Sequence, residues 1–206
     1  MLYIRLLFVL TLCASALSGC ISMPESEREL VEGRQEQLVL RDVSTGEMML
    51  INTMPKHYKV YNLEDFYSEI GFNPKGENLY MVAFKDPIGA NYARSIRLES
   101  VDLVKKLFPN MEAVDDKADA FRHTYFSFRL SQKIGTERAK KFCDAYEISN
   151  INKIGSRCMD LWNNREGRRL FYQSKGSVLS NESLQLKILE KMKNGDIAVA
   201  PFELRF

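Results

Sequence analysis

Residues 115–130 read DDKADAFRHTYFSFRL, and apolar side chains recur among them at helical spacing. They form one stripe with a period of three to four residues, made up of Ala118, Phe121, Tyr125 and Phe128. Two further stretches follow with the same period, and they contain CDAYE at residues 143–147 and MDLWNNREGR at residues 159–168. Apolar stripes of this kind pack against other helices. The pattern therefore predicts a helical bundle in the C-terminal half of the chain.

The N-terminal half has shorter patterns. Residues 38–53 read LVLRDVSTGEMMLINT, in which two apolar runs flank a Ser-Thr-Gly turn, and this predicts a β-hairpin. Residues 79–84 read LYMVAF, an apolar run of strand length that Asp86-Pro87 ends, and residues 100–108 have the amphipathic pattern of a helix. A short helix is predicted between the hairpin and the apolar run, with Asn62 before it and Gly71 after it. We therefore predict an α+β fold, with a small strand-containing N-terminal half packed on the C-terminal helical bundle.

The first nineteen residues have the form of a secretory signal. Arg5 precedes an apolar run, and small residues follow. The run is shorter than the ~20 residues that a membrane span requires. It ends with Leu17, Ser18, Gly19 and Cys20, a sequence that resembles a bacterial lipobox. The resemblance implies a diacylglycerol group on Cys20, cleavage before it, and a further acyl chain such as palmitate on the new amino terminus. An ordinary cleaved signal is the alternative.

The chain is thus expected to have four segments. They are a lipoprotein signal peptide at 1–19, a polar tether at 20–37, a small α+β region at 38–110 and a helical domain with the polar motifs at 111–206. An Asp after Cys20 would resemble the inner-membrane retention signal of enteric-type bacteria; Ile21 stands there instead, which favours the outer membrane. The formal net charge of +2 gives no strong field for nucleic acid. The expected partner is therefore the membrane, through lipidated Cys20, and the motifs identify no envelope substrate or protein partner.

Two cysteines remain once the leader and the lipid account for Cys13 and Cys20. The cell envelope permits disulfides, and a bridge between Cys143 and Cys158 would stabilise the chain by ~3 kcal/mol in the chain-entropy model. Two free buried thiols, packed as small apolar residues, are the alternative. The sequence leaves both open.

Each of the three predicted C-terminal helices carries polar side chains on an otherwise apolar pattern. Asp119, Arg122 and His123 lie three or four residues apart and share one face of the first helix. Asp144 and Glu147 share a face of the second helix. The third helix carries Asp160, Asn163, Asn164 and Arg168. Because buried polar groups need partners, we expect the three sets to face one another and Arg122 to pair with a carboxylate of another helix.

The sequence motifs of these three predicted helices resemble those of an uncharacterised bacterial domain of secreted and cell-surface proteins. Its members carry Asp-Ala-x-Arg-His, Ala-His-Glu and Met-Asp-x-x-Asn-Asn-x-x-Gly-Arg on successive helices, and the resemblance covers about residues 115–169. It implies that the polar side chains of the three helices are the family's shared set. Tyr146 stands where that domain has histidine. If the histidine were a ligand or a base, the resemblance implies an altered or inactive member.

Two functions fit these patterns. In the first, the chain is a lipid-anchored cell-envelope protein, an outer-membrane lipoprotein with a binding or structural periplasmic domain. In the second, it is a lipid-anchored hydrolase of envelope material. His123 is then the general base or a metal ligand, Asp119 orients it, and Glu147 or Asp144 is a second acid or ligand. The side chains expected to bind substrate are Arg122, Asp144, Asp160, Asn163, Asn164 and Arg168.

The arrangement of the three helices separates the two functions. Convergence of the polar side chains beside an open cleft would favour the hydrolase. Convergence without a cleft would favour a structural core, in which the same residues hydrogen-bond between helices. The motifs name no cofactor and leave a metal requirement open.

Overall fold

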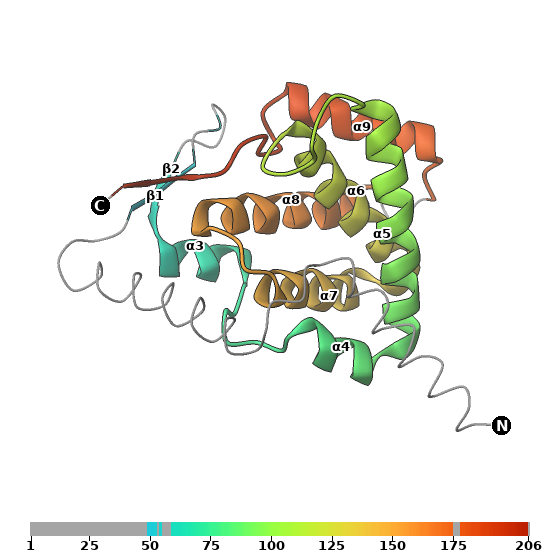
Figure 1. Cartoon of the computed structure of the whole chain (residues 1–206), viewed down its shortest axis with the longest axis horizontal. Helices are drawn as coiled ribbons and strands as arrows, with labels where there is room; N and C mark the ends of the chain where they lie inside the picture. Colours follow the sequence, from blue (N-terminus) through green and yellow to red (C-terminus); the bar gives the residue numbers. More distant parts are fainter. Residues whose placement is uncertain (1–48, 53, 55–58, 175–177, 206) are drawn as a thin grey trace.

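The computed structural model describes residues 49–52, 54, 59–174 and 178–205 (Figure 1). The helices in this part of the chain are α3 (Leu63–Ile70), α4 (Leu79–Lys85), α5 (Pro87–Leu107), α6 (Lys117–Ile134), α7 (Thr136–Ser149), α8 (Ile154–Gln173) and α9 (Asn181–Lys193). The strands are β1 (Met49–Asn52), β2 (Lys59–Asn62) and β3 (Glu203–Arg205). The predicted signal peptide, Cys20 and the tether lie outside the described residues. None of the described helices is both long and apolar enough to cross a bilayer.

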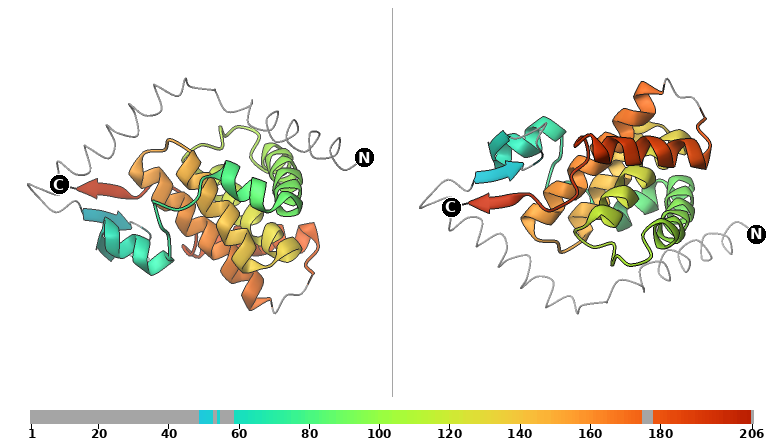
Figure 2. Two further views of the ribbon diagram at one scale, coloured as in Figure 1. Left: turned by 90° about the horizontal axis from the view of Figure 1, so that it is seen from below. Right: turned by 90° about the horizontal axis from the view of Figure 1, so that it is seen from above.

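Helix α6 is central to the domain and packs against α5, α7 and α8, while α5 runs crosswise to α7 and α8 (Figures 1 and 2). The predicted stripe is confirmed, because Phe121, Tyr125 and Phe128 are fully buried. Backbones of α6 and α8 meet at Gly167, where a Cβ atom would lie 2.4 Å from the carbonyl oxygen of Thr124. This close approach brings the polar side chains of α6 and α8 next to each other.

Capping residues mark the ends of α3 and α6, and at α3 they are the residues that the sequence predicts. Asn62 precedes α3 and accepts a hydrogen bond from the backbone N–H of Asp65 at 2.8 Å, and Gly71 ends the helix with a φ of 68°. Asp116 caps α6 by accepting from the N–H of Asp119 at 2.9 Å. Gly135 follows that helix with a φ of 83°. Local capping chemistry therefore sets where the site helix begins and ends.

The predicted α+β fold class is wrong, since the chain folds into a mostly helical domain of seven helices within the described residues. Residues 79–84 belong to helix α4 and are not a strand; Asn78 caps this helix by accepting from the N–H of Met81 at 3.0 Å. Within α4, Val82 is buried, whereas Tyr80 and Phe84 are exposed. Pro87 occupies the first turn of α5, where a missing N–H is no loss. No strand interrupts the described residues between 80 and 196.

The strands of the described residues form a small antiparallel ribbon in the order β2-β1-β3, at the opposite end of the molecule from α5 (Figure 1). Most of the predicted hairpin, residues 38–48 and 53, lies outside the described residues. Its remaining part is β1, which pairs with β2 and with the C-terminal strand β3. The ribbon closes one end of the helical domain and is not a layer of its core.

Candidate functional site

His123 lies among carboxyl groups from three helices. Its Nε2 atom is 3.4 Å from Asp119 Oδ1, one turn earlier on α6, and 3.3 Å from Asp160 Oδ1 on α8. Its Nδ1 atom is 3.7 Å from Glu147 Oε1 on α7. All four side chains are buried. The structure thus brings together the three residues predicted as catalytic, His123, Asp119 and Glu147, and adds Asp160.

Arg122 fixes the orientation of the imidazole. Its guanidinium pairs with Asp119, and its Nη2 atom donates to His123 Nε2 at 3.0 Å. The expected bond from Arg122 to a carboxylate of another helix is not formed, because Asp119 lies one turn away on the same face. A guanidinium can only donate hydrogen bonds, so Arg122 is the donor in this contact, while Nδ1 on the other side of the ring faces Glu147.

Asp119 is the fixed anion of the cluster. Burial by itself would raise the pKa of Asp119, but its contacts with His123 and Arg122 hold that pKa well below the ordinary range. The backbone N–H of Asp115 also donates to Asp119 Oδ2, at 3.0 Å. Ser156 on α8 in turn donates to the carboxylate of Asp115 at 2.9 Å. This chain of contacts holds the Asp119–Arg122 pair against His123.

Glu147 and Asp160 differ from Asp119, because their pKa values are raised. Burial raises the pKa of Glu147 to about 8 and the pKa of Asp160 well above its ordinary value. Each has one partnered oxygen: Asn164 donates to Glu147 Oε1 at 3.3 Å, and Asn152 donates to Asp160 Oδ2 at 3.2 Å. The other oxygens, Glu147 Oε2 and Asp160 Oδ1, are buried without a hydrogen bond. Two carboxyl groups that favour the protonated form therefore lie beside the imidazole.

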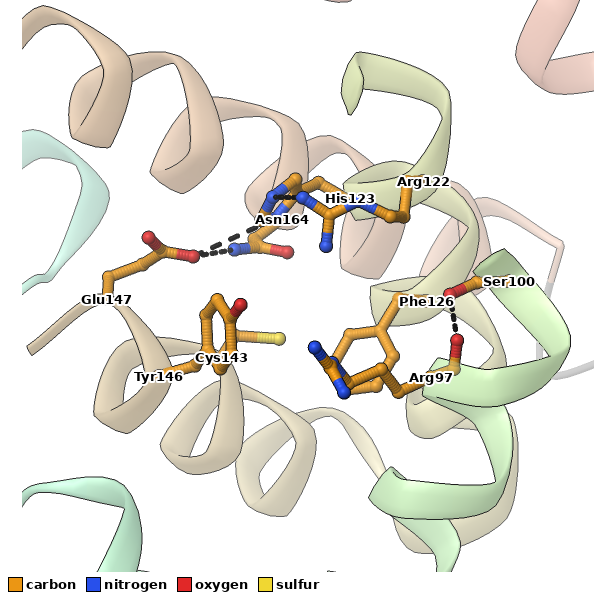
Figure 3. A pocket seen from close by; sticks show the side chains of 9 residues that line it. All are labelled: Arg97, Ser100, Arg122, His123, Phe126, Cys143, Tyr146, Glu147 and Asn164. Atoms are coloured by element: carbon orange, nitrogen blue, oxygen red, sulfur yellow. Dashed lines mark hydrogen bonds and ion pairs between the residues drawn. The ribbon is translucent and has the colours of Figure 1, made fainter. Parts of the chain in front are cut away.

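A cavity of ≈ 30 Å³ lies next to this cluster, among α5, α6, α7 and α8. Its wall is formed by Arg97, Ser100, Arg122, His123, Phe126, Cys143, Tyr146, Glu147 and Asn164 (Figure 3). This volume has room for one or two water molecules. The side chains of Arg97, Phe126 and Tyr146 are only half-buried, so the wall reaches the surface of the domain. Tyr146, which stands where the similar bacterial domain has histidine, is part of this wall.

One group of described residues could hold a divalent cation. The ligand atoms of Asp119, His123 and Asp160 all lie within 4.8 Å of one another, and carboxylate oxygens with an imidazole nitrogen are ordinary ligands for such ions. Arg122 already contacts both Asp119 and His123, however, so a cation there would have to displace a guanidinium. The side chains of this chain thus supply the positive charge at that place.

The remaining predicted binding residues divide into two groups. Asp160 and Asn164 belong to the cluster, as described above. Asp144 instead pairs with Lys140, one turn earlier on α7. Asn163 donates to the carbonyl of Ala198 at 2.8 Å and accepts from its N–H at 2.9 Å, so it holds the C-terminal segment against α8. Arg168 is half-buried with an unpartnered Nη1 atom, and neither it, Asp144 nor Asn163 lines the cavity.

Both described cysteines are free and buried, so the structure does not contain the disulfide that the sequence allows. Burial raises the pKa of the Cys143 thiol to about 11, and it raises the pKa of Cys158 as well. Cys143 donates to the hydroxyl of Ser127 at 3.7 Å. Neither sulfur is a thiolate at neutral pH, and reactivity at a thiol follows the thiolate.

Arg97 and Ser100 are cavity residues that sequence reasoning missed. They lie on α5, of which only residues 100–108 showed a helical pattern in the sequence. A weak signal was present, because Ile96, Ser100 and Val104 are spaced by four residues and are all buried in the structure. That spacing extends the helix toward its N-terminus and places Arg97 beside its buried face.

Residues 80–196, more than half of the chain, match the family model described as Domain of unknown function (DUF6973). The chain therefore belongs to this family. No curated protein and no solved structure matches the chain. The family description assigns no activity, so the function has to be argued from the cluster around His123 and the cavity beside it.

Proposed function

We propose that this member of the DUF6973 family is a lipid-anchored hydrolase of cell-envelope material, with Glu147 as its proton-transfer group. The location rests on the sequence of residues 1–21: a signal, Cys20 in a lipobox-like position, and Ile21, which favours the outer membrane. The hydrolytic role rests on the convergence of His123, Asp119 and Glu147 beside a cavity. The binding or structural domain, which the sequence also allows, lacks that kind of support.

The observation that carries the proposal is the free oxygen of Glu147. Glu147 lines the cavity, its Oε2 atom is buried without a partner, and its pKa is raised to about 8. A group with a pKa near the working pH is best suited to take a proton and return it. From the sequence we placed the base at His123, but the Nε2 lone pair of His123 accepts from Arg122. Glu147 is therefore the better candidate for the group that touches water and substrate.

The surrounding residues position Glu147. The Nδ1 atom of His123 lies 3.7 Å from Glu147 Oε1, and Asn164 donates to the same oxygen, while Oε2 has no hydrogen-bond partner. Ionised Glu147 takes a proton from a water molecule in the cavity as that water attacks the substrate. The same carboxyl then returns the proton to the leaving group, so no net proton is consumed. Acid–base catalysis of this kind typically contributes about 10²–10⁴-fold to the rate.

Unsatisfied polar atoms weigh against a purely structural cluster. Glu147 Oε2, Asp160 Oδ1 and Asn164 Oδ1 are all buried without a hydrogen bond. Each such atom costs about 1–3 kcal/mol, and a structural network would be expected to satisfy them. Groups with displaced pKa values beside a cavity are instead typical of sites that bind or react.

The test is hydrolysis by the full-length protein in nonionic detergent. Phospholipid vesicles, peptidoglycan and soluble esters are each offered, and released products are measured with wild type and His123→Ala. We expect at least one substrate class to be hydrolysed, and His123→Ala to lower that rate because Glu147 loses its positioning partner. Inactivity of the folded wild type on every class would support the binding module instead.

The hydrolysis rate is also measured with a chelator present. Because Arg122 supplies the positive charge beside Asp119 and His123, we expect EDTA to leave the rate unchanged. Loss of the rate with EDTA and its return with a divalent ion would instead assign Asp119, His123 and Asp160 to a metal centre.

A further inference from the structure

Two arginines from adjacent helices point into the cavity from one side (Figure 3). Arg97 reaches it from α5 and Arg122 from α6, and both line the space that Glu147 lines from α7. Each guanidinium is a planar fork of N–H donors that matches the oxygens of an anion. The cavity therefore has donors on one wall and the proton-transfer group on the opposite wall.

Arg97 has no internal partner for its charge. Its guanidinium forms no ion pair and no hydrogen bond with any described residue, and its buried Nε atom is unpartnered. The contact of Ser100 with this residue goes to the backbone carbonyl of Arg97, not to its side chain. Arg122 differs, because Asp119 already balances its charge. One positive charge thus remains uncompensated at the cavity wall.

The rest of the wall carries little negative charge to oppose an anion. Glu147 is its single carboxyl group among the described residues. Burial favours the neutral form of Glu147 and raises its pKa to about 8, although Arg122 and Arg157 act in the other direction. Phe126 and Cys143 add apolar surface, which strengthens electrostatic attraction by excluding water.

We propose that Arg97 and Arg122 bind the phosphate group of a phosphate-bearing substrate beside Glu147. A phosphate has enough oxygens to accept from both guanidinium groups and still face Glu147, whereas a carboxylate has only two. The cavity of ≈ 30 Å³ has room for one or two water-sized atoms, so phosphate oxygens enter it and the rest of the substrate lies outside it. As a statement about substrate this rests on the proposed hydrolase, while the phosphate site itself is measurable without any turnover.

The experiment measures binding of inorganic phosphate to the full-length protein in nonionic detergent, by titration calorimetry at pH 7. We expect wild type to bind phosphate, Arg97→Gln to bind it at least tenfold more weakly, and Arg97→Lys to fall between them. Arg94→Gln is the matched control, because Arg94 is exposed on the same helix one turn earlier. This control should bind phosphate as wild type does.

Three results would overturn the inference: no phosphate binding by folded wild type, equal affinity in Arg97→Gln, or tighter binding of acetate than of phosphate. Competition with two phosphate compounds distinguishes a lipid headgroup from a soluble phosphate ester. Stronger displacement of phosphate by a short-chain phosphatidylglycerol than by glycerol phosphate supports a lipid headgroup, and the reverse order supports a soluble ester. Either order supports the phosphate site.

The same measurements separate this inference from the proposed function. Phosphate binding that depends on Arg97, in a protein that hydrolyses none of the substrate classes, would retain the phosphate site and remove the hydrolase. Hydrolysis that phosphate does not inhibit and that Arg97→Gln does not change would retain the hydrolase and remove the phosphate site.

Discussion

Glu147 is the residue whose protonation couples the stability of the domain to its chemistry. Its ordinary pKa is 4.5, and burial raises it to about 8 in the folded chain. Between these two pH values the folded chain keeps a proton that the unfolded chain loses. Stability from the neutral carboxyl is therefore complete below pH 4.5 and is lost as the pH rises through 8.

We expect the free energy of unfolding, measured in urea, to fall by a few kcal/mol, in order of magnitude, between pH 4.5 and pH 8. Glu147→Gln should flatten this part of the profile, because an amide of the same shape does not titrate. The charged groups that act on Glu147 are Arg122, Arg157 and Asp119. A profile that is equally steep in the variant would assign the titration to Asp160 instead.

Two adjacent asparagines show what single residues of the sequence could and could not tell. Asn163 and Asn164 both look like members of one polar set. Neighbours on a helix point about 100° apart, however, so Asn164 reaches Glu147 while Asn163 reaches the backbone of Ala198. The spacing of Asp119 and His123 did predict their shared face. Which asparagine joins them depends on where α8 and the C-terminal segment pack, and no local pattern contains that.

Helix α4 and the first half of α5 are the elements that the sequence misrepresented. LYMVAF is apolar at nearly every position, so neither a period of two nor a period of 3.6 is visible in it. The following Asp86-Pro87 was read as a stop, yet Asp86 accepts from the N–H of Gly89 at 2.9 Å and caps α5. Elements with a clear apolar stripe and caps, such as α6, were predicted correctly. Arg97 was missed because the sequence did not predict the part of α5 that contains it.

The contact between α6 and α8 gives a prediction at the scale of elements. A Cβ atom at Gly167 would lie 2.4 Å from the carbonyl oxygen of Thr124 and 3.0 Å from Ser127 Cβ. Because the first of these is backbone, α8 would have to move away from α6. We expect Gly167→Ala to lower the free energy of unfolding by about 1–3 kcal/mol, measured by chemical denaturation.

The same shift should also separate Asp160 and Asn164 on α8 from His123 and Glu147, so the hydrolysis rate should fall with the stability. A Gly167→Ala protein as stable as wild type would show that the two helices do not touch there.

At the scale of the whole molecule, the site exists only because helices from separate parts of the chain meet. The sequence supplied the polar sets of α6, α7 and α8, and their convergence was an expectation that the structure meets at His123. The cavity also needs α5, whose packing against α6 depends on buried side chains of both helices. The predicted fold class was also wrong at this scale. The described residues before α6 fold mainly into helices, which pack on this bundle.

The membrane location is a prediction for the whole protein, and the residues that carry it, the signal peptide and Cys20, lie outside the described residues. The acyl chains on Cys20 are the expected source of membrane affinity, since each buried CH₂ contributes about 0.8 kcal/mol. Cys20→Ser should therefore release the protein from the membrane fraction or leave it unprocessed. Metabolic labelling with palmitate checks this, and equal labelling of variant and wild type would contradict it.

In the proposed hydrolytic reaction Glu147 transfers the proton, and the hydrolysis rate of Glu147→Gln is the sharpest test of this role. Glutamine has the shape of the neutral carboxyl, so the variant should fold and should be at least as stable as wild type at pH 8. Glu166→Gln is the matched control: Glu166 is also a buried glutamate, but it faces Arg165, Arg169 and Lys191 and does not line the cavity. We predict that Glu147→Gln lowers the rate at least about 100-fold, in line with the loss of an acid–base group, while Glu166→Gln does not. A Glu147→Gln protein that hydrolyses its substrate at the wild-type rate would show that Glu147 is not the proton-transfer group.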